Sequence, residues 1–322
     1  MLLNILFLLI GFIILVKGAD ILVDGASSTA KNLGVSSLVI GLTIIAFGTS
    51  SPELAVSFKA IYSGNGDIVI GNVIGSSISN ILLILGISSL FGKIKVKPTT
   101  IKKEIPIFII ISLLFSLLFS DKIFNSNTTN YISRSDAIAL LLFFTIFIYY
   151  LKNIIKNSRK ENIEIKSIKN YNTIKSTIFI LLGLVGLILG SNLVVNSASY
   201  IAKNLGISKR IISFTVIAIG TSLPELVSSI VSLKKGQHDI VIGNVIGSNI
   251  FNIGIVLALP VAIFGGISAC SFTYIDLLVL ITSSIILYLF AKNNGEISKI
   301  EGVLMLILYL VYYSYIIWGG NL

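Results

Sequence analysis

Apolar stretches long enough to cross a lipid bilayer recur from one end of this chain to the other. A transmembrane helix needs about 20 mostly apolar residues. Of the 322 residues, 55% are apolar and only 12% are charged, whereas a soluble domain has about 25% charged residues. The sequence therefore predicts an all-α membrane protein with ten transmembrane helices. The predicted spans are residues 3–25, 36–61, 68–91, 105–120, 135–151, 175–197, 208–233, 240–265, 271–291 and 300–318.

A polar segment rich in Lys, Asn and Glu divides the ten spans into two sets of five. We expect a first five-helix repeat at residues 1–154, a linker at 155–173 and a second five-helix repeat at 174–322. At this length the linker has no room for a folded regulatory domain.

Basic residues are distributed unequally between the loops on the two sides of the membrane. The loops on the side of the linker hold 17 Lys and Arg residues, and the loops on the opposite side hold 6. Because cytoplasmic loops carry the excess of Lys and Arg, we expect a multi-pass protein of the cell membrane with a cytoplasmic linker and both termini extracytoplasmic. The net charge of +10 is thereby explained without a nucleic-acid partner, and no obligate protein partner is evident.

The first half of the chain is repeated in the second half. With a shift of 172 positions, residues 18–81 align without a gap with residues 190–253, and about 35 of the 64 pairs are identical. Each half has five spans, an odd number, so the second copy enters the membrane from the opposite side. Inverted repeats are typical of transporters that bind their substrate near the bilayer midplane, at the interface of the repeats.

The two copies are most alike at Gly48-Thr-Ser-Ser-Pro-Glu53 and Gly220-Thr-Ser-Leu-Pro-Glu225, each inside an apolar span. A proline removes a backbone donor and clashes with the carbonyl four residues earlier. Each motif therefore predicts a helix break, and carbonyl oxygens freed within the membrane must be satisfied by protein, water or an ion. Hydroxyl oxygens at the same level come from Thr49, Ser50, Thr221 and Ser222.

Glu53 and Glu225 are the predicted centre of an ion site. A charge at the bilayer centre costs roughly 2.5–3.5 kcal/mol on insertion scales, and both copies of the motif keep the carboxylate. The alternative interpretation is a buried, protonated carboxyl group that is hydrogen-bonded to the backbone.

Polar residues four positions apart follow in the next span of each repeat, so they share one helix face. They are Asn72, Ser76 and Asn80 in the first copy and Asn244, Ser248 and Asn252 in the second. These stripes either join helices to one another or face the glutamates, and we expect the innermost residues to face the glutamates.

An all-oxygen site of this kind suits hard cations such as Ca²⁺ or Na⁺. Two carboxylates balance one Ca²⁺, and they could equally hold two or more Na⁺ or two protons. Competition for one pair of carboxylates is a sufficient basis for exchange. A passive cation channel could use the same carboxylates. An enzyme is not expected, because His238 and Cys270 are the only residues of their kinds and no nucleophile–base pair is recognisable.

These motifs resemble those of the cation/calcium exchanger superfamily, and of its prokaryotic sodium/calcium exchangers in particular, over essentially the whole chain. The resemblance implies that Glu53 and Glu225 ligate Ca²⁺ together with the carbonyl oxygens of Thr49 and Thr221. It also implies Na⁺ ligands, which are the carbonyl oxygens of Ala46 and Ala218 and the side chains of Ser50, Ser76, Ser222 and Ser248. Asn80 and Asn252 would flank the centre.

The resemblance predicts a secondary active antiporter that exchanges Ca²⁺ for Na⁺ by alternating access, with these ions as transported substrates and no organic cofactor. Some relatives, including potassium-dependent exchangers, have Asp at the position of Asn252. Asparagine at both symmetric positions argues against a potassium requirement. A proton-coupled Ca²⁺ antiporter remains an alternative.

Overall fold

The computed structural model describes residues 1–120, 130–158, 171–206, 218–269 and 272–319, and these residues are almost entirely helical. Each of the ten predicted spans contains at least one helix. In chain order the helices are α1 (Leu2–Leu33), α2 (Ser37–Ile40), η1 (Gly41–Ile45), α3 (Ala46–Thr49), α4 (Ser51–Tyr62), α5 (Gly66–Ile78), η2 (Ser79–Leu85), α6 (Gly86–Phe91), α7 (Pro98–Lys102), α8 (Glu104–Leu118), α10 (Arg134–Ser158), α11 (Thr173–Asn204), α13 (Ala218–Thr221), α14 (Leu223–Lys234), α15 (His238–Phe251), η4 (Asn252–Leu257), α16 (Ala258–Phe264), α17 (Tyr274–Asn294) and α18 (Lys299–Gly319).

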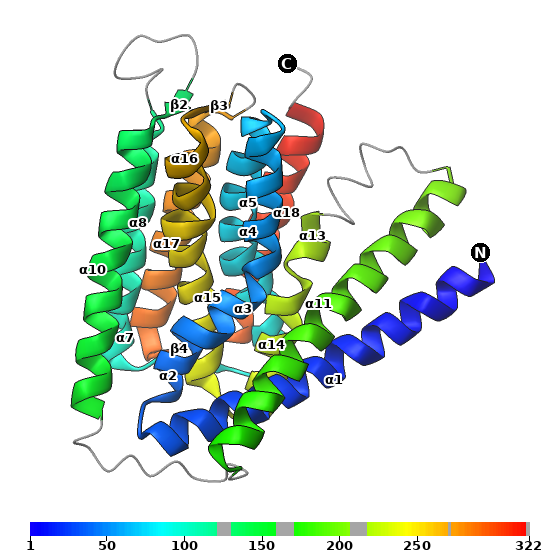
Figure 1. Ribbon diagram of the computed structural model, residues 1–322, viewed down its shortest axis with the longest axis vertical. Helices are drawn as coiled ribbons and strands as arrows, with labels where there is room; N and C mark the ends of the chain where they lie inside the picture. The colour runs from blue at the N-terminus through cyan, green and yellow to red at the C-terminus, as the bar shows by residue number, and fades with distance from the viewer. Residues whose placement is uncertain (121–129, 159–170, 207–217, 270–271, 320–322) are drawn as a thin grey trace.

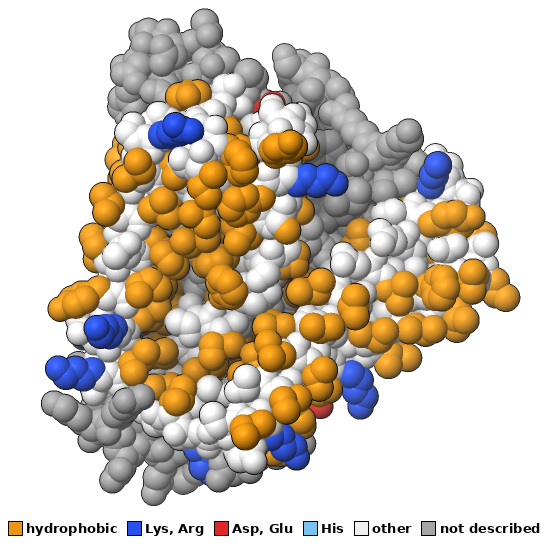
Figure 2. Space-filling model, in the orientation of Figure 1, with side chains coloured by type: hydrophobic (Ala, Val, Ile, Leu, Met, Phe, Trp, Pro, Cys, Tyr) orange, Lys and Arg blue, Asp and Glu red, His pale blue; other side chains and the backbone are white. Residues whose placement is uncertain are grey.

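The length and composition of these helices confirm the prediction of an all-helical membrane protein. Within the described residues, 7 helices are long and apolar enough to cross a membrane, and the bent pair formed by 37–49 and 51–62 brings the number to 8. Apolar side chains are spread over the described part of the face shown in Figure 2, and its few Lys and Arg side chains lie mostly toward the margins. Such a surface suits contact with lipid along the helices and with water at their ends.

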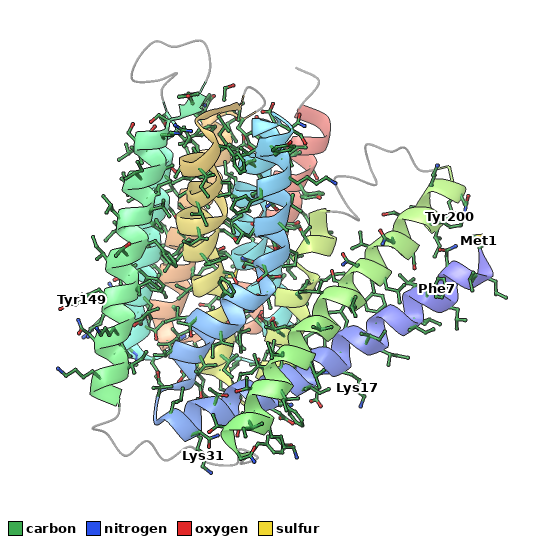
Figure 3. All side chains as sticks on the ribbon, in the orientation of Figure 1. Met1, Phe7, Lys17, Lys31, Tyr149 and Tyr200 are labelled. Carbon is green, nitrogen blue, oxygen red and sulfur yellow. The ribbon has the colours of Figure 1, made fainter. Side chains whose placement is uncertain are left out.

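The helices α1 and α11 form a long diagonal pair that leans away from the main bundle (Figure 1). Each has 32 residues, and at 1.5 Å per residue such a helix is about 48 Å long. The hydrocarbon core is about 30 Å thick, so helices of this length tilt. Met1 and Tyr200 lie at one end of the pair and Lys31 lies at the other (Figure 3).

Glycines allow the backbones of α1 and α11 to meet. A Cβ atom added at Gly18 would lie 2.8 Å from the backbone nitrogen of Leu187, and one added at Gly183 would lie 2.6 Å from that of Leu22. Small residues are what membrane helices use for close packing. The pair is therefore expected to behave as one unit.

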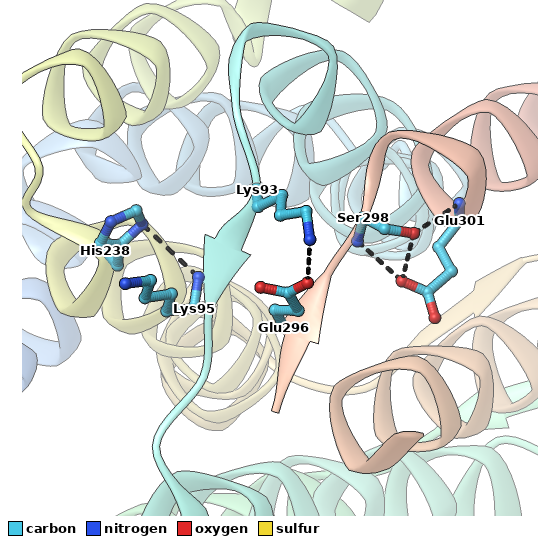
Figure 4. Close-up of polar contacts among 6 residues, drawn as sticks. All are labelled: Lys93, Lys95, His238, Glu296, Ser298 and Glu301. Carbon is cyan, nitrogen blue, oxygen red and sulfur yellow. Dashed lines mark hydrogen bonds and ion pairs between the residues drawn. The ribbon is translucent and has the colours of Figure 1, made fainter. Parts of the chain in front are cut away.

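Two short antiparallel ribbons join loops at opposite ends of the bundle. At one end β1 (Ile94–Lys95) pairs with β4 (Glu296–Ile297), and at the other end β2 (Asn130–Ile132) pairs with β3 (Ile267–Ala269). Lys93 forms an ion pair with Glu296 at 2.5 Å beside the first ribbon, where the backbone nitrogen of Lys95 also donates to His238 Nδ1 (Figure 4). These ribbons join loops from the two halves of the chain.

The predicted linker at 155–173 falls largely outside the described residues. Helix α10 continues to Ser158 and α11 begins at Thr173, so each helix runs slightly into the predicted segment. Residues 159–170 between them are outside the described part of the chain.

Candidate cation site

Both predicted helix breaks are present, and they have the same backbone geometry. Ser50 separates α3 from α4 with φ −88° and ψ 5°, and Ser222 separates α13 from α14 with φ −89° and ψ 3°. In the first repeat the two segments are bent by 45°. Pro52 and Pro224 lie in the first turn of the second segment, where a missing N–H leaves no hydrogen bond unmade.

Each break places a glutamate in the first turn of the helix that follows it. Glu53 lies in the first turn of α4, and Glu225 lies in the first turn of α14. The partial positive charge of a helix N-terminus favours a carboxylate at this position. Both side chains are 1% exposed, and the two carboxyl groups are near enough to interact electrostatically. The inverted repeat thus produces one pair of buried acids.

Hydrogen bonds across the interface of the two repeats surround this pair. Ser50 Oγ donates to Glu225 Oε1 at 3.3 Å, which links the first break to the second glutamate. Thr49 Oγ1 lies 3.4 Å from Asn244 Oδ1, and it also lies 3.0 Å from the carbonyl oxygen of Ile45. The pair of glutamates therefore lies between the repeats, where inverted-repeat transporters bind their substrates.

The continuous segments α5–η2 and α15–η4 contribute amide groups from both repeats to the same region. Asn252 Nδ2 donates to Ser76 Oγ at 2.9 Å, and Asn80 Nδ2 donates to Asn249 Oδ1 at 3.0 Å. All four residues are at least 93% buried. Since the amide nitrogens of Asn80 and Asn252 are engaged, the side-chain oxygens of these two residues are left available to a ligand, whereas Asn249 Nδ2 has no partner among the described residues.

Asn80 and Asn252 lie at the start of π-helical turns, in η2 and η4 respectively. Single π-helical turns inside α-helices are rare and occur frequently at functional sites. The two copies again match, because both turns begin within one residue of the repeat-related position.

Several buried oxygen atoms of this region have no hydrogen-bond partner among the described residues. They are Glu53 Oε2, Glu225 Oε2, Asn80 Oδ1, Asn252 Oδ1, Ser222 Oγ, Ser248 Oγ and Ser77 Oγ. Buried polar atoms are nearly always hydrogen-bonded in proteins, and leaving one unsatisfied typically costs about 1–3 kcal/mol. A set of unsatisfied oxygens from both repeats is the arrangement that a bound cation would relieve.

Some predicted residues have other partners. Ser76 Oγ donates to the carbonyl of Asn72 at 2.5 Å while it accepts from Asn252. The carbonyl of Ala46 already accepts the backbone N–H of Ser50 at 3.0 Å. Ala218 begins α13, and its side chain lies outside the described part of the chain. Thr221 is the last residue of α13, next to the second break.

The sequence did not single out three other residues that the structure brings into view. Asn249 accepts from Asn80, and Ser191 Oγ donates at 2.8 Å to the carbonyl of Gly220, the group that Pro224 leaves without its helical donor. Glu104, at the start of α8, is also buried, at 2% exposed. The 172-residue shift pairs Ser191 with Ala19 and Asn249 with Ser77, so these departures from the repeat could have been found.

Comparison with known proteins gives matches along nearly the whole chain. A profile of the family described as "Sodium/calcium exchanger protein" matches residues 3–152 and 175–318. The putative antiporter CaxA of Alkalimonas amylolytica is 36% identical over 323 residues, covering 97% of this chain and 98% of CaxA. The sodium/calcium exchanger MaX1 of Methanosarcina acetivorans is 33% identical over 340 residues, covering 96% of this chain and 97% of MaX1.

A solved structure of the sodium-calcium exchanger NCX_Mj superposes on this chain with a TM-score of 0.82. The two sequences are 36% identical, and the match covers 97% of this chain and 98% of that one.

Proposed function

Because this chain belongs to the sodium/calcium exchanger protein family, a family of membrane antiporters and not of enzymes, we propose that it exports Ca²⁺ in exchange for Na⁺ that enters the cell. The two transported cations are its substrates. The family is one of exchangers, so the passive channel that the carboxylates alone would allow is set aside.

The observation that carries this proposal is the set of unpartnered oxygens around Glu53 and Glu225. Carboxylate, amide and hydroxyl oxygens are the ligands that Ca²⁺ takes at 2.3–2.6 Å, usually six to eight at a time. The unpartnered oxygens come from both repeats, and they are free to serve as ligands without breaking a hydrogen bond among the described residues. We propose that these atoms, together with Thr49, Thr221, Ser50, Ser76, Ala46 and Ala218, supply the ligands of the transported ions.

Competition between the ions follows from the charge of the site. Two carboxylates neutralise one Ca²⁺, and the same two charges are neutralised by two Na⁺. Ions of either kind that occupy the pair exclude the other kind, because the oxygens are shared. When the site opens alternately to the two sides of the membrane, such exclusion couples the movement of one ion to that of the other.

We further propose the arrangement of the chain in the cell membrane. The five-helix repeats are residues 1–154 and 174–322, the linker 155–173 is cytoplasmic and both termini are outside. The ion pairs Lys93–Glu296 and Lys97–Asp239 support this arrangement, because they join loops that the excess of basic residues assigns to the same side.

The test is an ion-dependence assay in reconstituted vesicles. Vesicles loaded with Na⁺ and diluted into Na⁺-free medium should accumulate ⁴⁵Ca²⁺ for as long as the outward Na⁺ gradient lasts. Uptake that does not depend on Na⁺ but depends on a pH gradient would contradict Na⁺ coupling and indicate proton coupling. Uptake that also needs K⁺ would identify a potassium-dependent exchanger, which Asn80 and Asn252 argue against.

A further inference from the structure

An ionic contact joins helix α1 to the C-terminal end of helix α14. Lys235, which follows the last residue of α14, places its Nζ atom 2.6 Å from Asp24 Oδ1 and 2.8 Å from Asp20 Oδ1. The same ammonium group donates to the backbone carbonyl of Asp20 at 2.7 Å. The side chains of Asp24 and Lys235 are 15% and 26% exposed, whereas that of Asp20 is 47% exposed. The pair of Lys235 and Asp24 is therefore partly shielded from water, and the pair of Lys235 and Asp20 is not.

The inverted repeat has no counterpart of this contact. The 172-residue shift relates Asp20 to Asn192, Asp24 to Asn196 and Lys235 to Ser63. Asparagine and serine can form a neutral hydrogen bond but no ion pair. Of the two repeat-related contacts, only the contact between α1 and α14 can be ionic.

The packing of the helices shows the same difference between the two repeats. Helix α1 packs along α14. The repeat-related helices α11 and α4 have almost no contact with each other among the described residues. Helix α11 instead contacts α3, α13 and α14. In an inverted-repeat transporter the two access states exchange the conformations of the repeats, so the opposite state would bring α11 against α4 and separate α1 from α14.

We propose that Asp20, Asp24 and Lys235 form an ionic latch that favours the access state in which α1 closes against α14. In the arrangement proposed above, this state is closed toward the cytoplasm. This proposal depends on the proposed function, because it requires alternating access. The repeat alone would make the two access states nearly equal in free energy, and the latch would lower the free energy of one of them. The contact then has to separate before the site can open toward the cytoplasm.

The size of the preference follows from the contacts. Exposed ion pairs contribute little and partly shielded ones contribute more, and two pairs share one lysine here. We expect the latch to change the ratio of the two access states by about tenfold, which corresponds to about 1.4 kcal/mol.

The test measures two repeat-related distances by pulsed electron paramagnetic resonance on the full chain in lipid nanodiscs. Spin labels at Lys31→Cys and Lys234→Cys report the separation of α1 and α14, and labels at Lys203→Cys and Tyr62→Cys report that of α11 and α4. These four residues are exposed and are related in pairs by the shift of 172. Cys270→Ser removes the single native cysteine from both doubly labelled proteins.

The neutral variant combines Asp20→Asn, Asp24→Asn and Lys235→Ser, which gives the first contact the side chains of the second. In this variant fewer molecules should show the short α1–α14 distance and more should show the short α11–α4 distance. The ratio of the two populations should change by about tenfold. An unchanged ratio would overturn the proposal.

The transplanted variant adds Asn192→Asp, Asn196→Asp and Ser63→Lys to the neutral variant and should favour the opposite state. Because a folding defect would not create a new short distance, this variant separates the latch from general damage. A transplanted variant with the distances of the neutral variant would also count against the latch.

Transport is measured beside the distances. The neutral variant keeps every proposed ion ligand, so Na⁺-dependent ⁴⁵Ca²⁺ exchange should persist in it. Absence of exchange in the unmodified protein would defeat the proposed function, while a distance shift in the neutral variant would still support the latch.

Discussion

Replacing Glu225 by Gln removes one of the two carboxylates of the candidate site while nearly preserving its shape. The glutamine still offers an oxygen to Ser50, which lies 3.3 Å from Glu225 Oε1. The side chain is 1% exposed, and removing one partner of a buried charge interaction costs about 3–5 kcal/mol. At 1.4 kcal/mol for each factor of ten, Ca²⁺ affinity should fall by about a hundredfold or more.

The loss should be larger for Ca²⁺ than for Na⁺, since the attraction of a carboxylate scales with the charge of the ion. Glu53→Gln should behave in the same way, because the repeat places it in an equivalent position. The assay is calorimetric titration of Ca²⁺ into the purified protein in Na⁺-free buffer, followed by competition with Na⁺.

Glu104→Gln is the matched control for these variants. Glu104 is as deeply buried, at 2% exposed, and its Oε2 is likewise unpartnered among the described residues. Its Oε1 accepts from the hydroxyl of Tyr150, and it belongs to α8 rather than to a helix break. It should leave Ca²⁺ affinity unchanged. Equal losses in all three variants, or wild-type affinity in either site variant, would refute the assignment of the site.

Four further substitutions test the contacts of the site and the packing of the helices. Ser191→Ala removes the donor to the carbonyl of Gly220, so the free energy of unfolding should fall by about 1–2 kcal/mol, and an unchanged melting temperature would contradict the contact. Gly183→Val adds a side chain whose Cβ meets the backbone of α1 at 2.6 Å and should destabilise the protein by about 1–3 kcal/mol. Gly92→Ala, whose Cβ would meet one atom at 3.9 Å, should be neutral in the same thermal unfolding series. Asn252→Asp turns the amide whose oxygen is unpartnered into a carboxylate, a third negative charge, and should tighten Ca²⁺ binding about tenfold at alkaline pH. Binding that does not respond would place this residue outside the site.

The sequence predicted the helical membrane fold because lipid imposes simple requirements on composition. A span must be apolar over about 20 residues, and this constraint located a helix in all ten predicted stretches. The prediction did not give the length of α1 and α11, which extend beyond residues 25 and 197 to Leu33 and Asn204. Their ends are polar, and the end of α1 is held by contacts distant in the sequence, since Ser28 Oγ and Asn32 Nδ2 both donate to the carbonyl of Tyr171.

The helix breaks were predictable because proline and glycine act on the backbone locally. The orientation of the amide groups was not, since it depends on contacts between residues far apart in the chain. Asn80 and Asn249, which are 169 positions apart, illustrate this limit. Departures from the repeat, such as Ser191 opposite Ala19 or Asp24 opposite Asn196, were visible in the sequence, but only the packing of the helices gives them meaning.

The central claim is that oxygens from both repeats hold the transported cation between Glu53 and Glu225. Anomalous diffraction from crystals in which Sr²⁺ replaces Ca²⁺ tests this claim directly. We predict a single strong peak within about 2.3–2.8 Å of the carboxylate oxygens of both glutamates, which weakens as the Na⁺ concentration in the crystal is raised. A peak elsewhere in the protein, or one at this position that Na⁺ does not displace, would contradict the account.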